Sequence, residues 1–189
     1  FRRVLFRSVV PDRASFDAKV RQATGSGDDL IITFEPGGDS LVIVGALGSG
    51  ALPNIMFANS VIWDAAALVQ ASISAQSSPD DDVVRGSDRA DVLAGGRGDD
   101  LLVGGRGSDT YIFVRGDGQD VIEDEQGNDR LELFGYVPAD VRVERLAAGR
   151  DDLILTFADS GDSIIIRNAA IETLVFGNGV EWSRDTLLD

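Results

Sequence analysis

The feature that most constrains this chain is a nine-residue repeat between residues 86 and 132. The copies align to the template Gly-Gly-x-Gly-x-Asp-x-U-x, where U is a large apolar residue, and they begin at residues 86, 95, 104, 115 and 124. A two-residue insertion, Phe113-Val114, follows the third copy. Every copy keeps the acid at position six, namely Asp91, Asp100, Asp109, Asp120 and Asp129. Every copy also keeps the apolar residue at position eight, namely Leu93, Leu102, Tyr111, Ile122 and Leu131.

The residue types of the repeat predict a turn followed by a short strand. Glycines at positions one, two and four permit positive φ, so that backbone carbonyl groups can face into the turn. The aspartate adds a carboxylate at the end of the turn, and the x-U-x triplet forms a strand whose apolar residue points into a core. Carbonyl and carboxylate oxygens together suit Ca²⁺ better than Mg²⁺, which requires strict octahedral geometry.

The charge of this segment gives a physical reason for a cation. Residues 80–132 carry 15 acidic and 6 basic side chains, which is −9 of the formal net charge of −15. Like unit charges about 4 Å apart repel by roughly 1 kcal/mol in water and about 4 kcal/mol at a partly shielded site. Two or three bound Ca²⁺ ions would contribute roughly 5–8 kcal/mol at 100 times their dissociation constant. We therefore expect the segment to be unfolded without metal.

The composition excludes several classes of function. The chain has no Cys and no His, which removes thiolate chemistry, the usual zinc ligands and a Ser-His-Asp triad. We expect no catalytic residues and no small-molecule substrate within these residues. The acidic balance argues against nucleic acid as a partner. No apolar run approaches the roughly 20 residues of a membrane span.

A second, longer repeat flanks the nonapeptides. DDLIITFEPGGDSLVIV begins at Asp28 and DDLILTFADSGDSIIIR begins at Asp151, 123 residues later. FANSVIW at 57–63 matches FGNGVEW at 176–182, where the offset is 119 residues. The β-branched runs separated by turn residues predict an antiparallel hairpin in each copy, and Asn-Gly predicts another. Asp64 could cap a short helix, DAAALVQA, after the first copy.

These patterns predict an all-β protein in which a roll of nonapeptides is flanked by two small antiparallel β-units. Residues 1–10, FRRVLFRSVV, resemble a translated sequencing adapter and are expected to be a non-native leader. The first β-unit is expected at 11–69, a polar linker at 70–82, the roll at 83–132 and the second β-unit at 133–189. Both ends are expected to be cut from a longer, tandemly repeated parent.

Residues 83–132 resemble the haemolysin-type, or RTX (repeats-in-toxin), calcium-binding array. Residues 133–189 and 12–69 resemble the haemolysin-type calcium-binding-related block that follows such arrays. The resemblance implies a parallel β-roll in which repeat n stacks on repeat n+2, with calcium between stacked turns. It also implies three pairs: Asp91 with Asp109, Asp100 with Asp120, and Asp109 with Asp129.

The resemblance further implies that backbone oxygens of the turns complete each calcium shell. These belong to Gly86, Gly95, Gly96, Arg97, Gly98, Gly104, Gly105, Arg106, Gly107, Gly118 and Gly127. The sequence departs from the family pattern in places. Arg89 replaces a glycine, the insertion puts 20 rather than 18 residues between Asp100 and Asp120, and the fifth copy opens with Asp124-Glu125-Gln126.

Three functions remain open at this point. The resemblance implies a module that leaves a Gram-negative bacterium by type I secretion, with the secretion machinery as its partner. It implies further that the module then folds in calcium and acts outside the cell or at its surface. The segment could instead belong to an adhesin whose β-units bind glycans or cells. It could also be the tail of a secreted protease, lipase or lyase, which an H-E-x-x-H or G-x-S-x-G motif upstream would indicate.

Overall fold

The computed structural model describes residues 18–23, 29–34, 39–43, 55–56, 62–146 and 151–188. The expected leader at residues 1–10 lies outside the described residues. The chain divides into two compact units, Phe1–Ala75 and Gln76–Asp189, which we describe separately. Of the helices in the described part of the chain, none has the length and hydropathy needed to cross a membrane.

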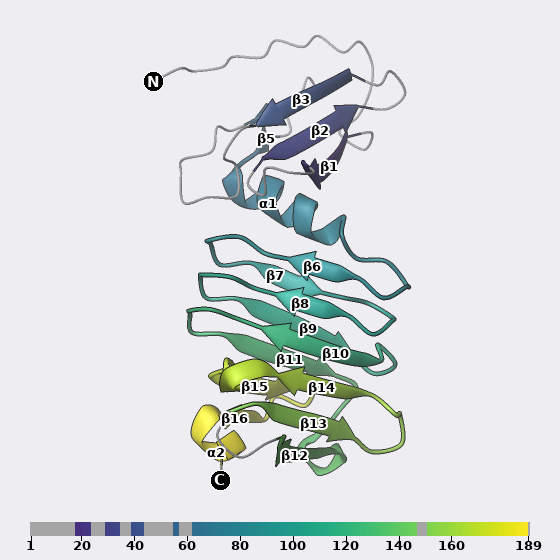
Figure 1. Ribbon diagram of the computed structural model, residues 1–189, viewed down its shortest axis with the longest axis vertical. Helices are drawn as coiled ribbons and strands as arrows, with labels where there is room; N and C mark the ends of the chain where they lie inside the picture. Colours follow the sequence, from purple (N-terminus) through teal and green to yellow (C-terminus); the bar gives the residue numbers. More distant parts are fainter. Residues whose placement is uncertain are drawn as a thin grey trace. The chain divides into compact units, whose positions relative to one another are not determined.

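The nonapeptides of the second unit form two facing parallel sheets (Figure 1). One sheet contains β6 (Val83–Arg85), β8 (Leu101–Val103) and β10 (Gln119–Glu123). The other contains β7 (Val92–Ala94), β9 (Thr110–Val114) and β11 (Arg130–Phe134). Consecutive strands therefore alternate between the sheets, and each strand pairs in parallel with the strand two repeats away. This confirms the predicted all-β parallel β-roll.

The core of the roll is built from the position-eight residues. All five predicted inward residues have exposed fractions of 2% or less, and they are Leu93, Leu102, Tyr111, Ile122 and Leu131. Val84 on β6 is equally buried and occupies the same place one repeat earlier. One inward apolar residue per short strand is enough here, because the two sheets face each other and bury it on both sides.

The insertion Phe113-Val114 lengthens the strands instead of forming a loop. It extends β9, and the parallel register continues through Phe113↔Leu133 and Val114↔Phe134. The Phe113 ring is buried and stacks on Phe157, with a centroid distance of 5.3 Å. The roll is consequently wider from this point towards the C-terminus, with room for aromatic side chains.

The second β-unit continues both sheets of the roll. On one side β14 (Ser163–Ile166) pairs in parallel with β10, and the antiparallel strands β13 (Leu153–Phe157) and β12 (Val141–Arg145) follow it. On the other side β15 (Thr173–Phe176) pairs in parallel with β11 and forms a hairpin with β16 (Glu181–Ser183). The hairpins were expected, and both sheets run across residue 133, where the second β-unit was expected to begin. The sheets are shared because roll strands offer unpaired edges that must be covered.

Three short helices complete this unit. The 3₁₀-helices are η2 (Pro138–Asp140) and η3 (Arg167–Ala169), and the helix α2 is Arg184–Leu188. The side chain of Leu187 on α2 is buried. Phe176 and Trp182 pack edge to face at a centroid distance of 4.8 Å, so this aromatic pair closes the second β-unit.

The first unit repeats the pattern of the second β-unit. Its described elements are β1 (Ala18–Gln22), β2 (Leu30–Phe34), β3 (Asp39–Ile43), β4 (Ile55–Met56), β5 (Ile62–Trp63) and α1 (Ala65–Ser74). The β1–β2 register begins at Ala18↔Phe34 and the β12–β13 register at Val141↔Phe157, so the 123-residue offset holds at each strand. The pairs Ile55↔Trp63 and Leu174↔Trp182 preserve the 119-residue offset in the same way.

The predicted helix forms, with its cap. The Asp64 carboxylate accepts a hydrogen bond of 2.9 Å from the backbone N–H of Ala67, and α1 begins at Ala65. The helix continues to Ser74 because Ser72 and Ile73 are buried in its last turn. Residues 70–82, expected to be a linker, therefore comprise the end of α1 and, from residue 77, a first turn of the roll.

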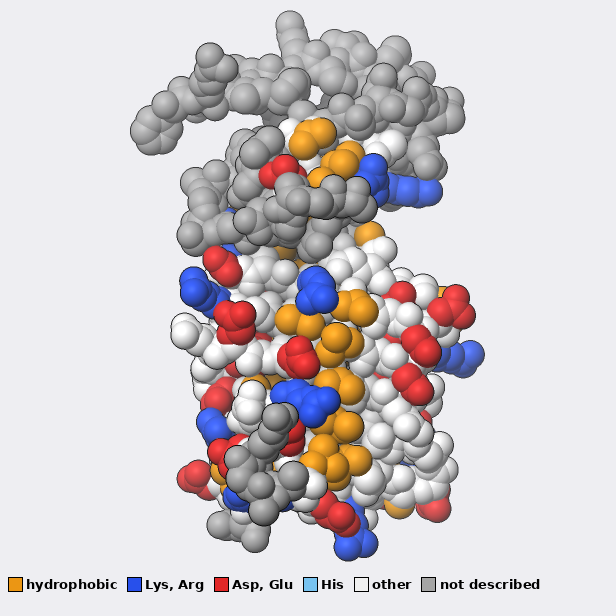
Figure 2. Space-filling view, in the orientation of Figure 1, with side chains coloured by type: hydrophobic (Ala, Val, Ile, Leu, Met, Phe, Trp, Pro, Cys, Tyr) orange, Lys and Arg blue, Asp and Glu red, His pale blue; other side chains and the backbone are white. Residues whose placement is uncertain are grey.

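The outer face of the six-stranded sheet carries a row of apolar side chains (Figure 2). The register aligns Val83 with Leu101, Leu101 with Val121, and Val121 with Ile165. These side chains alternate with the buried residues of the same strands and so point outward. Cross-strand apolar contacts of this kind stabilise a sheet by roughly 0.2–1 kcal/mol per pair.

Candidate metal sites

The position-six aspartates stack in two columns, one at each turn edge of the roll. In each column the backbone N–H of one acid donates to a carboxylate oxygen of the next. The first column is Asp82 to Asp100 (2.8 Å) and Asp100 to Asp120 (3.1 Å). The second is Asp91 to Asp109 (2.8 Å), Asp109 to Asp129 (2.8 Å) and Asp129 to Glu172 (2.6 Å). The structure thus brings together all three pairs that the resemblance implied.

The predicted aspartates are buried, and two of them have an oxygen without a partner. Their exposed fractions are 5% for Asp91, 1% for Asp109 and 2% for Asp100, Asp120 and Asp129. The Oδ1 atoms of Asp100 and Asp109 accept the column hydrogen bonds, whereas their Oδ2 atoms find no hydrogen-bond partner among the described residues. A buried carboxylate oxygen without a partner is costly unless a cation or proton satisfies it.

The pKa values show what the turns do to these acids. Burial raises the pKa of Asp109 to about 7, and the neighbouring carboxylates of Asp124 and Asp91 add to the rise. Burial also raises the pKa of Asp120 to about 7 and that of Asp129 to about 6. The pKa of Asp91 is raised by burial although Ser87 opposes the rise. Each turn therefore disfavours a bare negative charge and would favour a cation beside it.

The position-one glycines leave the space that these carboxylates fill. A Cβ at Gly86 would lie 3.0 Å from Oδ2 of Asp91, and a Cβ at Gly104 would lie 2.6 Å from Oδ2 of Asp109. A Cβ at Gly95 would lie 2.5 Å from the carboxyl carbon of Asp100. Glycine is required because the acid of the same turn folds back over this position.

The position-four glycines keep successive turns in contact. A Cβ at Gly98 would lie 2.8 Å from the Asp80 carbonyl oxygen, in the turn two repeats earlier. Gly107, Gly118 and Gly127 approach the turn two repeats earlier in the same way. Gly118 and Gly127 each lie 20 residues after the glycine on which they stack, so the stacking of turns continues across the two-residue insertion.

The predicted backbone ligands lie on these turns, and some of their carbonyl oxygens already accept hydrogen bonds. The Gly105 oxygen accepts from the N–H groups of Glu125 at 3.1 Å and Gln126 at 3.3 Å, and the Gly118 oxygen accepts from the N–H of Ser163 at 3.0 Å. The Gly95 oxygen accepts from the hydroxyl of Ser77. A carbonyl oxygen has two lone pairs, so the single bond at Gly118 or Gly95 leaves room for a metal, whereas the Gly105 oxygen already accepts two bonds. Gly96, Arg97 and Arg106 occupy positions two and three of their turns, and both arginine side chains are exposed.

The structure adds Asp124 to the predicted acids of the second column. One carboxylate oxygen from each of Asp109, Asp124 and Asp129 lies within 4.8 Å of the others. The Tyr111 hydroxyl donates a hydrogen bond to Oδ2 of Asp124. On sequence, Asp124 was a departure from the glycine pattern. An acid in place of the first glycine was the available signal, because that position faces the carboxylate of the turn stacked on it.

Two further acids were missed because their repeats are degenerate. Asp82 is the sixth residue of SSPDDDVVR at 77–85, a copy without glycines that nevertheless keeps Asp and Val at positions six and eight. Glu172 precedes β15 and pairs with Asp129, where no nonapeptide is recognisable. Only the parallel register places it in the column.

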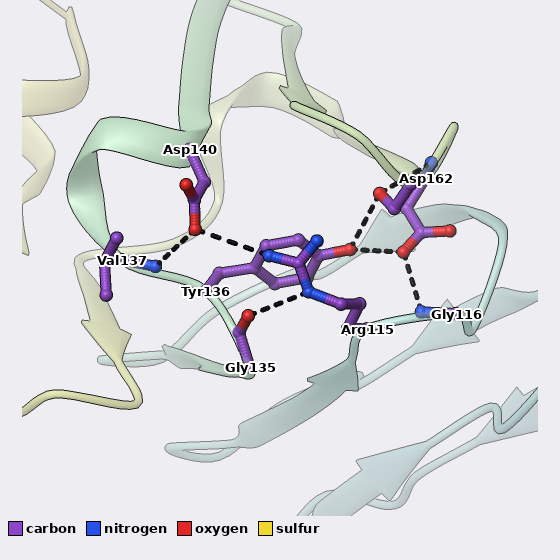
Figure 3. A network of polar contacts seen from close by, with 8 residues as sticks. Arg115, Gly116, Gly135, Tyr136, Val137, Asp140 and Asp162 are labelled. Carbon is purple, nitrogen blue, oxygen red and sulfur yellow. Dashed lines mark hydrogen bonds and ion pairs between the residues drawn. The ribbon is translucent and has the colours of Figure 1, made fainter.

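A third group of polar residues, gathered around the buried Tyr136 and Asp162, closes the wide end of the roll by mutual contacts (Figure 3). Oδ2 of Asp162 accepts hydrogen bonds from the Tyr136 hydroxyl and from the Gly116 N–H, the latter at 2.7 Å. The Arg115 guanidinium lies 4.4 Å from the centre of the Tyr136 ring and pairs with Asp140 at 3.4 Å. Because these groups satisfy one another, Asp162 differs from the aspartates of the columns.

Comparison with known protein families agrees with this geometry. Residues 77–111 and 115–133 match the family model of the RTX calcium-binding nonapeptide repeat (4 copies). Residues 152–186 match the haemolysin-type calcium binding protein related domain. No curated protein matches the chain. The first match begins at residue 77, where the structure places the first turn of the roll. The nonapeptide segment thus carries calcium-binding repeats with a structural role.

Proposed function

We propose, from the RTX calcium-binding repeats that this chain carries, that calcium is the switch that folds the roll, and that the chain is a calcium-dependent folding module of an exported protein. The observation that carries the proposal is the pair of buried Oδ2 atoms of Asp100 and Asp109, which have no partner among the described residues. Each atom marks one turn column as incomplete without a cation.

The two unpartnered oxygens favour two principal calcium sites. The first would use Asp100 and Asp120, with backbone oxygens of the intervening turns. The second would use Asp109 and Asp129, with Asp124 as a third carboxylate. Ca²⁺ accepts six to eight oxygen ligands in flexible geometry, which suits a mixture of carboxylates and turn carbonyls. The ion supplies charge neutralisation and cross-linking of stacked turns, and no bond-making step is assigned to it.

The size of the effect supports a switch. An ion present at 100 times its dissociation constant adds about 2.7 kcal/mol to stability when it binds the folded state alone. Two ions would add about 5 kcal/mol by the same relation, which is the scale of the whole stability of a small domain. Removal of the ions would also leave the carboxylates buried beside one another, and burial first, then the neighbouring acids, raise the pKa of Asp109 and Asp120.

This switch suits a protein that crosses a membrane unfolded. Where calcium is scarce, as inside a cell, the repulsion between the turn acids keeps the repeats open for transport. Where calcium is abundant, as outside, the same acids bind the ion and the roll closes. The proposal therefore places the folded chain outside the cell or at its surface, with the type I secretion machinery as its partner during export.

The test is a calcium titration of the full chain followed by far-ultraviolet circular dichroism, with magnesium as a control. We expect a cooperative gain of β-signal with calcium alone, at a midpoint that Asp109→Asn shifts to higher calcium. Asp159→Asn is the matched control, because Asp159 is exposed and lies outside the columns. A spectrum that is fully folded after calcium removal, and unchanged by calcium, would overturn the proposal.

A further inference from the structure

The first turn of each column is completed by a serine. Oδ2 of Asp82 accepts hydrogen bonds from the backbone N–H of Ser78 at 2.6 Å and from its hydroxyl at 2.7 Å. Oδ2 of Asp91 accepts the same two bonds from Ser87, at 2.6 and 2.8 Å. The same oxygen that is unpartnered in Asp100 and Asp109 is thus doubly bonded in the turns that begin the columns.

The residue at position two of the turn accounts for this difference. Ser78 and Ser87 occupy that position in the first turns, whereas Gly96 and Gly105 occupy it in the next ones. The two glycines have φ of +99° and +102°. Among the described non-glycine residues only Asp159 and Asn168 have positive φ, so neither serine adopts this conformation. A serine strongly disfavours positive φ because of its Cβ. In the conformation that each serine adopts, its backbone N–H and its side-chain hydroxyl both donate to the acid.

We propose that Ser78 and Ser87 are caps that take the place of calcium at the N-terminal end of the two turn columns. The inference rests on the proposed calcium sites and assigns them: turns with glycine at position two bind an ion, and turns with serine there close without one. The serine satisfies the carboxylate oxygen with two hydrogen-bond donors, whereas in the inner turns a bound cation would satisfy it by coordination. The identity of a single residue per turn therefore sets how many ions the roll takes.

A cap is needed at this end for a physical reason. An inner turn has a neighbouring turn on each side, and both contribute oxygens to a cation held between them. A first turn in the described roll has a neighbour on one side only, so its acid has fewer groups with which to share an ion. Local hydrogen bonds from a serine satisfy this acid without a metal ion. The arrangement resembles the N-capping of a helix by the same residue type.

The experiment is a count of bound calcium ions by native mass spectrometry on the full chain at saturating calcium. We expect Ser87→Gly to bind about one ion more than the unaltered chain, because the turn then gains the glycine that an inner site has. Ser78→Gly repeats the test in the other column with the same expected gain. Ser108→Gly is the matched control, since Ser108 lies on a turn, at position five, and its substitution should leave the count unchanged.

The outcomes separate this inference from the proposed function. If Asp100→Asn and Asp109→Asn each lower the ion count while both glycine variants leave it unchanged, the calcium sites stand and the serine caps do not. If the aspartate variants leave the count unchanged, the proposed function itself is wrong. A glycine variant that fails to fold in saturating calcium also overturns the inference, because calcium should replace the lost serine contacts.

Discussion

The hydroxyl of Tyr111 donates a hydrogen bond to the carboxylate of Asp124, 13 residues further along the chain. Tyr111 is also a fully buried core residue at position eight of its repeat. One side chain therefore links the apolar interior of the roll to the acids of the second column. Calcium binding at those acids would therefore affect the packing of the core directly through Tyr111.

Asp124→Asn should weaken calcium binding while keeping the roll intact. The amide retains an oxygen that can accept the Tyr111 hydroxyl, but the site loses one of three carboxylates. Loss of one unit-charge attraction of about 1–4 kcal/mol corresponds to roughly fivefold or more in affinity. Calorimetric titration measures the change, with exposed Asp88→Asn as the control. Equal affinities in the two variants would remove Asp124 from the ligand set.

Gly98→Ala should prevent the close stacking of turns. Its φ of +123° is strained for alanine, and the added Cβ would lie 2.8 Å from the Asp80 carbonyl oxygen. Gly116→Ala is the control, because Gly116 also has positive φ, at +95°, but has no atoms within 4 Å of the added Cβ. We expect the control to lose about 1–2 kcal/mol from backbone strain alone. Urea unfolding in calcium should show a clearly larger loss for Gly98→Ala.

The stability of the calcium-free roll should fall as the pH rises from about 4 to 7. The pKa values of Asp109 and Asp120 are raised to about 7 in the folded state, so that state binds protons more tightly than the unfolded chain does. Their favourable contribution is therefore complete at pH below the ordinary pKa of aspartate and is lost as the pH passes the raised values. Far-ultraviolet circular dichroism after calcium removal, at pH 4.5, 6.0 and 7.5, tests this order, because the folded fraction should be largest at the lowest pH; a folded fraction that rises with pH contradicts it.

Tyr136→Phe should weaken the polar network that closes the wide end of the roll. The hydroxyl contacts both Asp162 and, at 3.0 Å, Ser160. Loss of a buried hydrogen bond to a charged group costs about 1.5–3 kcal/mol. Asp162 keeps its bond from Gly116, so the network should loosen without collapse. Thermal unfolding in calcium measures the loss, and Ser160→Ala should show a smaller one.

Much of the fold could be predicted because it follows from local periodicity. The aspartate at position six of each repeat was expected to face the turn, and the apolar residue at position eight was expected to face the core. The structure buries both sets. The 123-residue repeat fixed the strands of both β-units, since the same hydrophobic alternation gives the same register in each copy. The helix after Asp64 followed from its cap.

Other features depended on contacts between residues far apart in sequence. No sequence pattern in the second β-unit predicts that β14 and β15 join the sheets of the roll, or that Glu172 thereby extends a column of acids. Both sheets continue across residue 133, where the sequence predicted the start of a separate β-unit. The first turn at 77–82 was taken for linker because it has no glycines, although it keeps the acid that the column uses.

The sequence by itself therefore determined the repeat, the turn chemistry and the preference for a hard cation, because these depend on residue types at fixed short spacings. The tertiary structure alone decided which carboxylate oxygens are left without partners. Asp82, Asp91, Asp100 and Asp109 are equivalent in the repeat, yet serines satisfy the first two and nothing described satisfies Oδ2 of the others. The residue at position two differs between these turns, but only the folded turn shows that a serine there donates to the acid whereas a glycine takes positive φ and does not.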